Sequence, residues 1–157
     1  MSAESRLTSR IACRNASLMP RVRIVHIAAV AAGGAIGALL RVLFTERFPV
    51  LPDQFPLTTL AENVTGAFLL GVFVALLRAR VRGGDAIYLF ACTGILGSFT
   101  TFSALSLELA DLAQRGNVVL ALAYPLTSVA LGLVAALAGM VLASALRTRA
   151  GRREGGR

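Results

Sequence analysis

The sequence predicts an all-α membrane protein with four transmembrane helices. Of its 157 residues, 56% are hydrophobic, and the mean hydropathy of +0.73 is high for a soluble domain. Four apolar stretches, each long enough to cross a bilayer, follow one another at residues 24–40, 57–77, 86–107 and 116–146. We therefore expect one transmembrane domain over residues 23–146. A disordered basic tail, 1–22, should precede it, and a basic tail, 147–157, should follow it.

The first span, 24–40, has no formal charge and is expected to end at Arg41. The Arg41 side chain would cap the last carbonyls of the helix or anchor it at the lipid headgroups. Gly33, Gly34 and Gly37 have the small-residue spacing that lets membrane helices approach closely. The first span should therefore pack tightly against a neighbour.

The second span, 57–77, contains an acid, Glu62, directly before an amide, Asn63. An acid at the centre of a membrane helix costs about 2.5–3.5 kcal/mol on insertion scales. Two interpretations of Glu62 stay open. It is either an acid near the outer interface or paired to Arg41 or Arg47, or it is a protonation site or anion repeller. Asn63 could equally bond a neighbouring helix or donate to an anion.

The third span, 86–107, is uncharged but carries residues that weaken a helix near its centre: Gly94, Gly97, Thr100, Thr101 and Ser103. One interpretation is a small-residue packing face. The other is a functional break, since irregular backbone at membrane depth is tolerated where protein or water covers it. Carbonyl groups freed at such a break can bind a small cation.

The fourth span, 116–146, is longer than one crossing needs, so it should include a loop or tilt. Tyr124 and Ser128 are four positions apart and therefore share a helix face. Their hydroxyl groups could line a polar track, or bond locally to the backbone of their own helix.

Charge placement predicts the orientation of the bundle. All 16 basic residues are arginine, and 13 of them lie in the two tails and the second loop. Four spans put these segments on one side, with Arg41, Arg47 and Arg115 on the other. The positive-inside rule then places both termini in the cytoplasm, with the protein in the cell inner membrane.

The same residues exclude several functions. The arginines are not interleaved with aromatic residues, so no nucleic-acid surface is expected. We find no nucleophile–base pair, no phosphate-binding loop and no cluster of metal-ligating side chains, so the sequence does not predict an enzyme.

The chain resembles the small fluoride channels called Fluc or CrcB. Four motifs carry the resemblance over residues 30–146: GGAIGALLR, TTLAENVTGAFLLG, GILGSFTTFSALSLE, and Tyr124 with Ser128. The resemblance implies four-helix subunits that form an antiparallel dimer with two pores and let fluoride leave the cytoplasm passively, which reduces its toxicity. It also implies a structural Na⁺ at the dimer centre, bound by the backbone carbonyls of Gly97 and Thr100.

By motif position, the resemblance assigns an anion pathway to a set of polar and aromatic residues: Asn63, Thr101, Phe102, Ser103, Tyr124 and Ser128. Glu108 matches the acid that closes the third motif. Three positions depart from the pattern of the family. Leu105 stands where a second phenylalanine is expected, Gly132 replaces a hydroxyl, and Glu62 adds a charge beside Asn63.

These departures suggest that a pathway lined by this chain alone would conduct poorly. The strong arginine bias also suggests one fixed orientation, and therefore a heterodimer with a related, inverted subunit instead of a homodimer. Two alternatives are a proton-coupled small multidrug exporter that uses Glu62, and a non-conducting partner subunit, suggested by Leu105 and Gly132.

Overall fold

The computed structural model describes residues 23–49, 54–77 and 85–154, with side chains as far as Thr148. All regular structure in these ranges is helical. Four segments are long and apolar enough to cross a membrane: α2 (Ile24–Arg47), α3 (Leu57–Leu76), the third span (Ala86–Gln114), and α8 (Val118–Glu154). The predicted all-α, four-span fold is confirmed. The predicted N-terminal tail, 1–22, lies outside the described residues.

The third span is not one continuous helix. It begins as α5 (Ala86–Tyr88), continues as the π-helix η1 (Leu89–Leu96) and ends its first half as α6 (Gly97–Phe99). After two non-helical residues, α7 (Phe102–Gln114) forms the second half. The interruption in this span is as predicted, whereas the preceding π-helix has no clear signal in the sequence.

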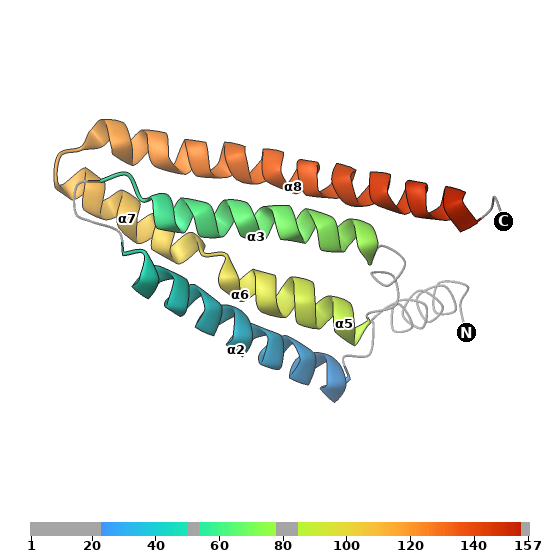
Figure 1. Cartoon of the computed structure of the whole chain (residues 1–157). Helices are drawn as coiled ribbons and strands as arrows, with labels where there is room; N and C mark the ends of the chain where they lie inside the picture. Colours follow the sequence, from blue (N-terminus) through green and yellow to red (C-terminus); the bar gives the residue numbers. More distant parts are fainter. Residues whose placement is uncertain (1–22, 50–53, 78–84, 155–157) are drawn as a thin grey trace, which may run out of the picture.

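The helices form two closely packed pairs that run side by side (Figure 1). The long helix α8 packs along α3, while α2 packs along η1 and α6. The second half of the third span, α7, crosses to contact α8 and so joins the pairs. Leucine and valine side chains cover the outer surface of α8, among them Leu122, Leu126, Val129 and Leu133, as expected for a face in contact with lipid.

Local sequence sets several helix ends. Asp85 caps the third span, because its carboxylate accepts a hydrogen bond of 2.8 Å from the Ile87 N–H. Between α7 and α8 the chain turns at Gly116, whose φ of +79° lies in the left-handed region that glycine adopts most easily. The described part of the turn is only three residues long, so α7 and α8 are adjacent and antiparallel.

Glycine allows the close approach of α2 to the third span. A Cβ atom at Gly33 would collide with the Phe90 carbonyl oxygen, and one at Gly37 with the Ile95 carbonyl oxygen. A Cβ atom at Gly34 would meet only the flexible Ser98 hydroxyl oxygen, at 3.2 Å. Backbone therefore packs directly against backbone at this contact, in the manner of small-residue membrane interfaces.

Glycine also allows the close approach of α3 to α8. A Cβ atom at Gly71 would collide with the carbonyl oxygen of Ala136 on α8. A Cβ atom at Gly139 would collide with the carbonyl oxygen of Phe68 on α3. Neither glycine was singled out from the sequence, because a single glycine in an apolar run does not show which helix it faces.

Two predicted boundaries are wrong. Arg41 does not end the first helix, because α2 continues through Arg47. The half-buried Arg41 side chain lies against the bundle, so its charge need not stand at the end of the helix. At the other end of the chain α8 continues to Glu154, so most of the predicted tail 147–157 extends the last helix.

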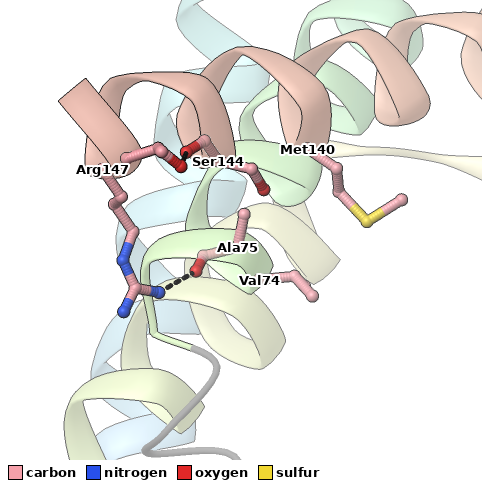
Figure 2. A pocket seen from close by; sticks show the side chains of 6 residues that line it. Val74, Ala75, Met140, Ser144 and Arg147 are labelled. Carbon is pink, nitrogen blue, oxygen red and sulfur yellow. Dashed lines mark hydrogen bonds between the residues drawn. The ribbon is translucent and has the colours of Figure 1, made fainter.

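A cavity of about 580 Å³ opens between the C-terminal end of α3 and the side of α8 (Figure 2). Arg147 reaches from α8 across this cavity and donates a hydrogen bond of 2.8 Å to the Ala75 carbonyl oxygen. A cation at the C-terminal end of α3 complements the partial negative charge of its last carbonyls. Arg147 therefore ties the two helices together at the arginine-rich end of the bundle.

Candidate functional site

The candidate site is built around the break in the third span. The break comprises Thr100 and Thr101, which both have extended backbone, with φ/ψ of −73°/147° and −141°/119°. Extended residues cannot continue the hydrogen-bond ladder of a helix, so the chain must satisfy their backbone groups in another way.

Asn63 on α3 replaces part of the missing ladder. Its side-chain oxygen accepts a hydrogen bond of 2.8 Å from the Thr101 N–H, and its side-chain nitrogen donates one of 3.1 Å to the Thr101 carbonyl oxygen. The amide thus pairs with both backbone groups of one residue, as a neighbouring β-strand would. Of the two roles open to Asn63, the structure shows the bond to a neighbouring helix.

Thr101 also starts the second half of the span. Its hydroxyl oxygen accepts a hydrogen bond of 3.1 Å from the Ala104 N–H, which makes Thr101 the N-cap of α7. The Ser103 hydroxyl lies 3.1 Å from the same oxygen. On the other side of the break, Thr100 donates a side-chain hydrogen bond of 2.9 Å to the Leu96 carbonyl oxygen.

These bonds divert two donors from the helical pattern. In a continuous α-helix the Thr101 N–H would bond the Gly97 carbonyl, and the Ala104 N–H would bond the Thr100 carbonyl. Here the first N–H is donated to Asn63 and the second to the Thr101 hydroxyl. The carbonyls of Gly97 and Thr100 therefore lose the donors that a continuous helix would give them.

A cavity of about 280 Å³ lies beside the break, between α3 and the third span. Its lining includes Asn63, Gly97 and Thr100, together with Gly66 and Cys92. Gly66 is required here, because a Cβ atom at this position would collide with the Thr100 methyl group. The break is thus accessible from one side and tightly packed on another.

A second group of polar side chains lies between the break, the N-terminal end of α3 and the C-terminal end of α7. Both carboxylate oxygens of Glu108 accept hydrogen bonds of 2.6 Å, one from the Thr59 hydroxyl and one from the Tyr124 hydroxyl. Tyr124 is fully buried. The rings of Phe55 and Tyr124 pack edge-to-face, with their centroids 5.5 Å apart. Three spans therefore meet at one carboxylate.

Glu62 is a second buried acid at this end of the bundle, and it is 1% exposed. One of its oxygens accepts a hydrogen bond of 3.0 Å from the Thr45 hydroxyl on α2. Within the described ranges, Glu62 forms no salt bridge with Arg41 or Arg47. The Arg41 Nε is buried and has no hydrogen-bond partner among the described residues. Glu62 is thus buried within the subunit and bonded to α2.

The comparisons with known proteins agree with this architecture. The family described as "CrcB-like protein, Camphor Resistance (CrcB)" matches residues 28–140. The chain belongs to the CrcB-like family. The match covers all four spans up to the second half of α8, so the family predicted from the motifs is confirmed, and the chain is a multi-pass membrane protein.

The match to this chain covers nearly the whole length of several curated relatives. A "Fluoride-specific ion channel FluC" from Agrobacterium fabrum is 40% identical over 120 residues, which is 76% of this chain and 96% of the relative. The protein of the same name from Rhizobium leguminosarum bv. trifolii is 42% identical over 118 residues, covering 74% and 94%. A third, from Chelativorans sp., is 43% identical over 122 residues, covering 77% and 98%.

The structure brings together only some of the residues that the CrcB-like resemblance assigned to an anion pathway. Asn63 and Thr101 are in contact at the break, and Tyr124 and Ser128 are both buried on α8. Phe102 is 78% exposed and points out of the single subunit. Ser103 is also exposed, although its hydroxyl lies 3.1 Å from that of Thr101.

Leu105, which stands in the second phenylalanine position, is buried in the subunit. Phe102 and Leu105 differ in exposure, at 78% and 5%, so the first side chain lies on the outside of the subunit and the second lies inside it. Gly132 lies against Ala67, to whose side chain an added Cβ would make ordinary contact at 3.9 Å.

Sequence reasoning missed two residues of the polar groups, Thr45 and Thr59. Each donates to a carboxylate on another segment, Glu62 in one case and Glu108 in the other. A threonine in an apolar run is compatible with local back-bonding, so its partner is visible only when the helices are packed. The spacing of Thr59 and Glu62, three residues apart on α3, was the available signal that they share a face.

Proposed function

We propose that this chain is a subunit of a fluoride-specific ion channel that lets fluoride leave the cytoplasm passively. The support comes from relatives of that name, at 40–43% identity over almost their full length. Fluoride crosses membranes as the neutral acid and dissociates inside the cell. A passive pathway for the anion then drains it without an energy source, and this function needs no catalytic machinery.

The observation that carries the proposal is the pairing of Asn63 with Thr101 at the break. It belongs to the span motifs on which the family resemblance depends, and it leaves backbone carbonyls available at membrane depth. Membership of the CrcB-like family gives no support to the alternative of a proton-coupled exporter.

A structural Na⁺ is part of the proposal. Its ligands would be the carbonyls of Gly97 and Thr100, whose helical donors are diverted to other acceptors. Carbonyl oxygens suit a small hard cation, and freed carbonyls in broken membrane helices bind Na⁺. A buried positive charge would also favour an anion nearby.

An antiparallel dimer follows from the same proposal. Phe102 is largely exposed at the centre of the span, and Ser103 beside it is polar. A second subunit would cover both side chains and complete a pathway that one subunit leaves open. Aromatic ring edges carry partial positive charge and can face an anion.

We further propose that the partner is a related subunit of opposite orientation, in the inner membrane. The distribution of 13 arginines against three favours one orientation of this chain, with both termini in the cytoplasm. Leu105 and Gly132 remove groups expected along the pathway. One of the two pores would then conduct less than the other.

The test is fluoride efflux from proteoliposomes, measured with a fluoride electrode, with chloride efflux as the selectivity control. This chain is reconstituted alone and together with a related chain of reversed arginine bias. Fluoride-selective efflux from the pair supports the proposal, and full efflux from this chain alone refutes the pairing. Absence of efflux from both preparations refutes the channel function and favours a scaffold.

A further inference from the structure

Glu62 is a buried acid that the proposed channel does not use. It lies in the second turn of α3, immediately before Asn63, and it is 1% exposed. Gly66, one turn further along the same face, packs against Thr100 at the break. Glu62 therefore faces the same side of α3 as the broken span, and an anion passing Asn63 would pass close to its carboxyl group.

The groups around Glu62 come from every helix at this end of the bundle. Thr45 on α2 donates the hydrogen bond of 3.0 Å, and Arg41 on the same helix lies within electrostatic range. Glu108 on α7 and Tyr124 on α8 interact electrostatically with Glu62 from the other side. Two carboxyl groups thus share one buried cluster with a single arginine.

The hydrogen bonds divide the two acids into different roles. Glu108 has a short donor at each oxygen, from Thr59 and Tyr124. Glu62 has one donor and no salt bridge within the described part of the chain. Because two like charges in one buried site oppose each other, Glu62 is the acid that gains most by taking up a proton.

We propose that Glu62 is a charge gate of the anion pathway, and that fluoride passes when its carboxyl group is protonated. The inference rests on the proposed fluoride channel function. An ionised Glu62 repels an approaching anion in a medium of low dielectric constant, whereas the protonated form adds no charge and offers an O–H donor. Fluoride flux should therefore rise as the pH falls.

The sign follows from the proton count. Lower pH increases the fraction of channels with a neutral Glu62, and these are the conducting channels. We expect fluoride efflux to rise about tenfold as the pH is lowered from about 8.5 to about 5.5. A tenfold effect needs only a small part of the repulsion energy expected for two unit charges in a protein interior. Vesicles without protein, measured at each pH, correct for leakage of the neutral acid.

The experiment uses the full chain, reconstituted as in the channel assay, with two variants. Glu62→Gln removes the charge and retains an oxygen that can accept from Thr45. Its efflux should be independent of pH and, at about pH 8.5, about tenfold above that of the unmodified protein. Glu46→Gln is the matched control, because Glu46 is an exposed acid next to Thr45 on α2, and it should keep the unmodified profile.

The outcomes separate the two proposals. Efflux from the unmodified protein that does not change with pH overturns the gate and leaves the fluoride channel in place. This measurement needs no variant, so it decides the matter even where Glu62→Gln does not fold. A Glu62→Gln profile identical to the unmodified one also overturns the gate. No fluoride efflux at any pH, from any preparation, overturns the channel function itself.

Discussion

The pairing of Asn63 with the Thr101 backbone predicts that this side chain holds the broken span together. In Asn63→Leu the side chain keeps a similar volume and loses both hydrogen bonds, of 2.8 and 3.1 Å. Leaving a buried N–H without an acceptor costs about 1–3 kcal/mol, and loss of an ordinary hydrogen bond to the carbonyl costs about 0.5–1.5 kcal/mol. We expect the free energy of unfolding to fall by about 2–4 kcal/mol.

Thermal unfolding of the detergent-solubilised protein measures this change. For a chain of this size, each 1 kcal/mol corresponds to roughly 2–4 °C in Tm, so Asn63→Leu should lower Tm by roughly 5–15 °C. The control is Asn117→Leu, which makes the same chemical change at a half-buried asparagine in the α7–α8 turn. Equal losses of Tm in the two variants would refute the reasoning.

Hydrogen exchange gives an independent reading of the same contact. The Thr101 amide should exchange faster in Asn63→Leu, because its acceptor is gone, while amides in the middle of α2 should be unaffected. An unchanged exchange rate at Thr101 would mean that another group accepts this hydrogen bond.

Three further predictions follow from other contacts. Gly37→Ala should destabilise the fold by about 1–3 kcal/mol, because the added methyl collides with the backbone of the third span. The control Gly132→Ala should be within about 0.5 kcal/mol of the unmodified protein. Equal Tm values for the two variants would contradict this prediction. Tyr124→Phe removes the donor to Glu108 and should cost about 1.5–3 kcal/mol and lower fluoride efflux, with unchanged Tm as the contrary result. Arg147→Gln loses one partly exposed bond between α3 and α8 and should change the free energy of unfolding by less than about 1 kcal/mol, which chemical denaturation can check.

The sequence was sufficient for the number of spans, whereas for the third span it left a packing face and a break open until the family resemblance favoured the break. Hydropathy defines the spans because a helix satisfies its own backbone hydrogen bonds in hydrocarbon. Thr100 and Thr101 mark the break because hydroxyl groups can replace helical hydrogen bonds, and Thr101 does so as the cap of α7. These signals come from residues that are close together in the sequence, so they can be recognised without knowing how the helices pack.

The contacts of the site could not be predicted in the same way. Thr59 donates a hydrogen bond to Glu108, which is 49 positions away in the sequence. The residues around either one do not indicate this partner. Arg41 was expected at a helix end because a charge usually marks one, but packing against the bundle allows α2 to continue past it. The exposure of Phe102 likewise has no explanation within one subunit.

The bond between α3 and the third span also has a mechanical consequence. A gap in a helix normally acts as a hinge, since the two halves are connected only by single bonds that rotate. Here the amide of Asn63 holds both the N–H and the carbonyl of the central residue, so bending at that point would break two hydrogen bonds at once. We therefore expect the interruption to bend less than a break without such a partner.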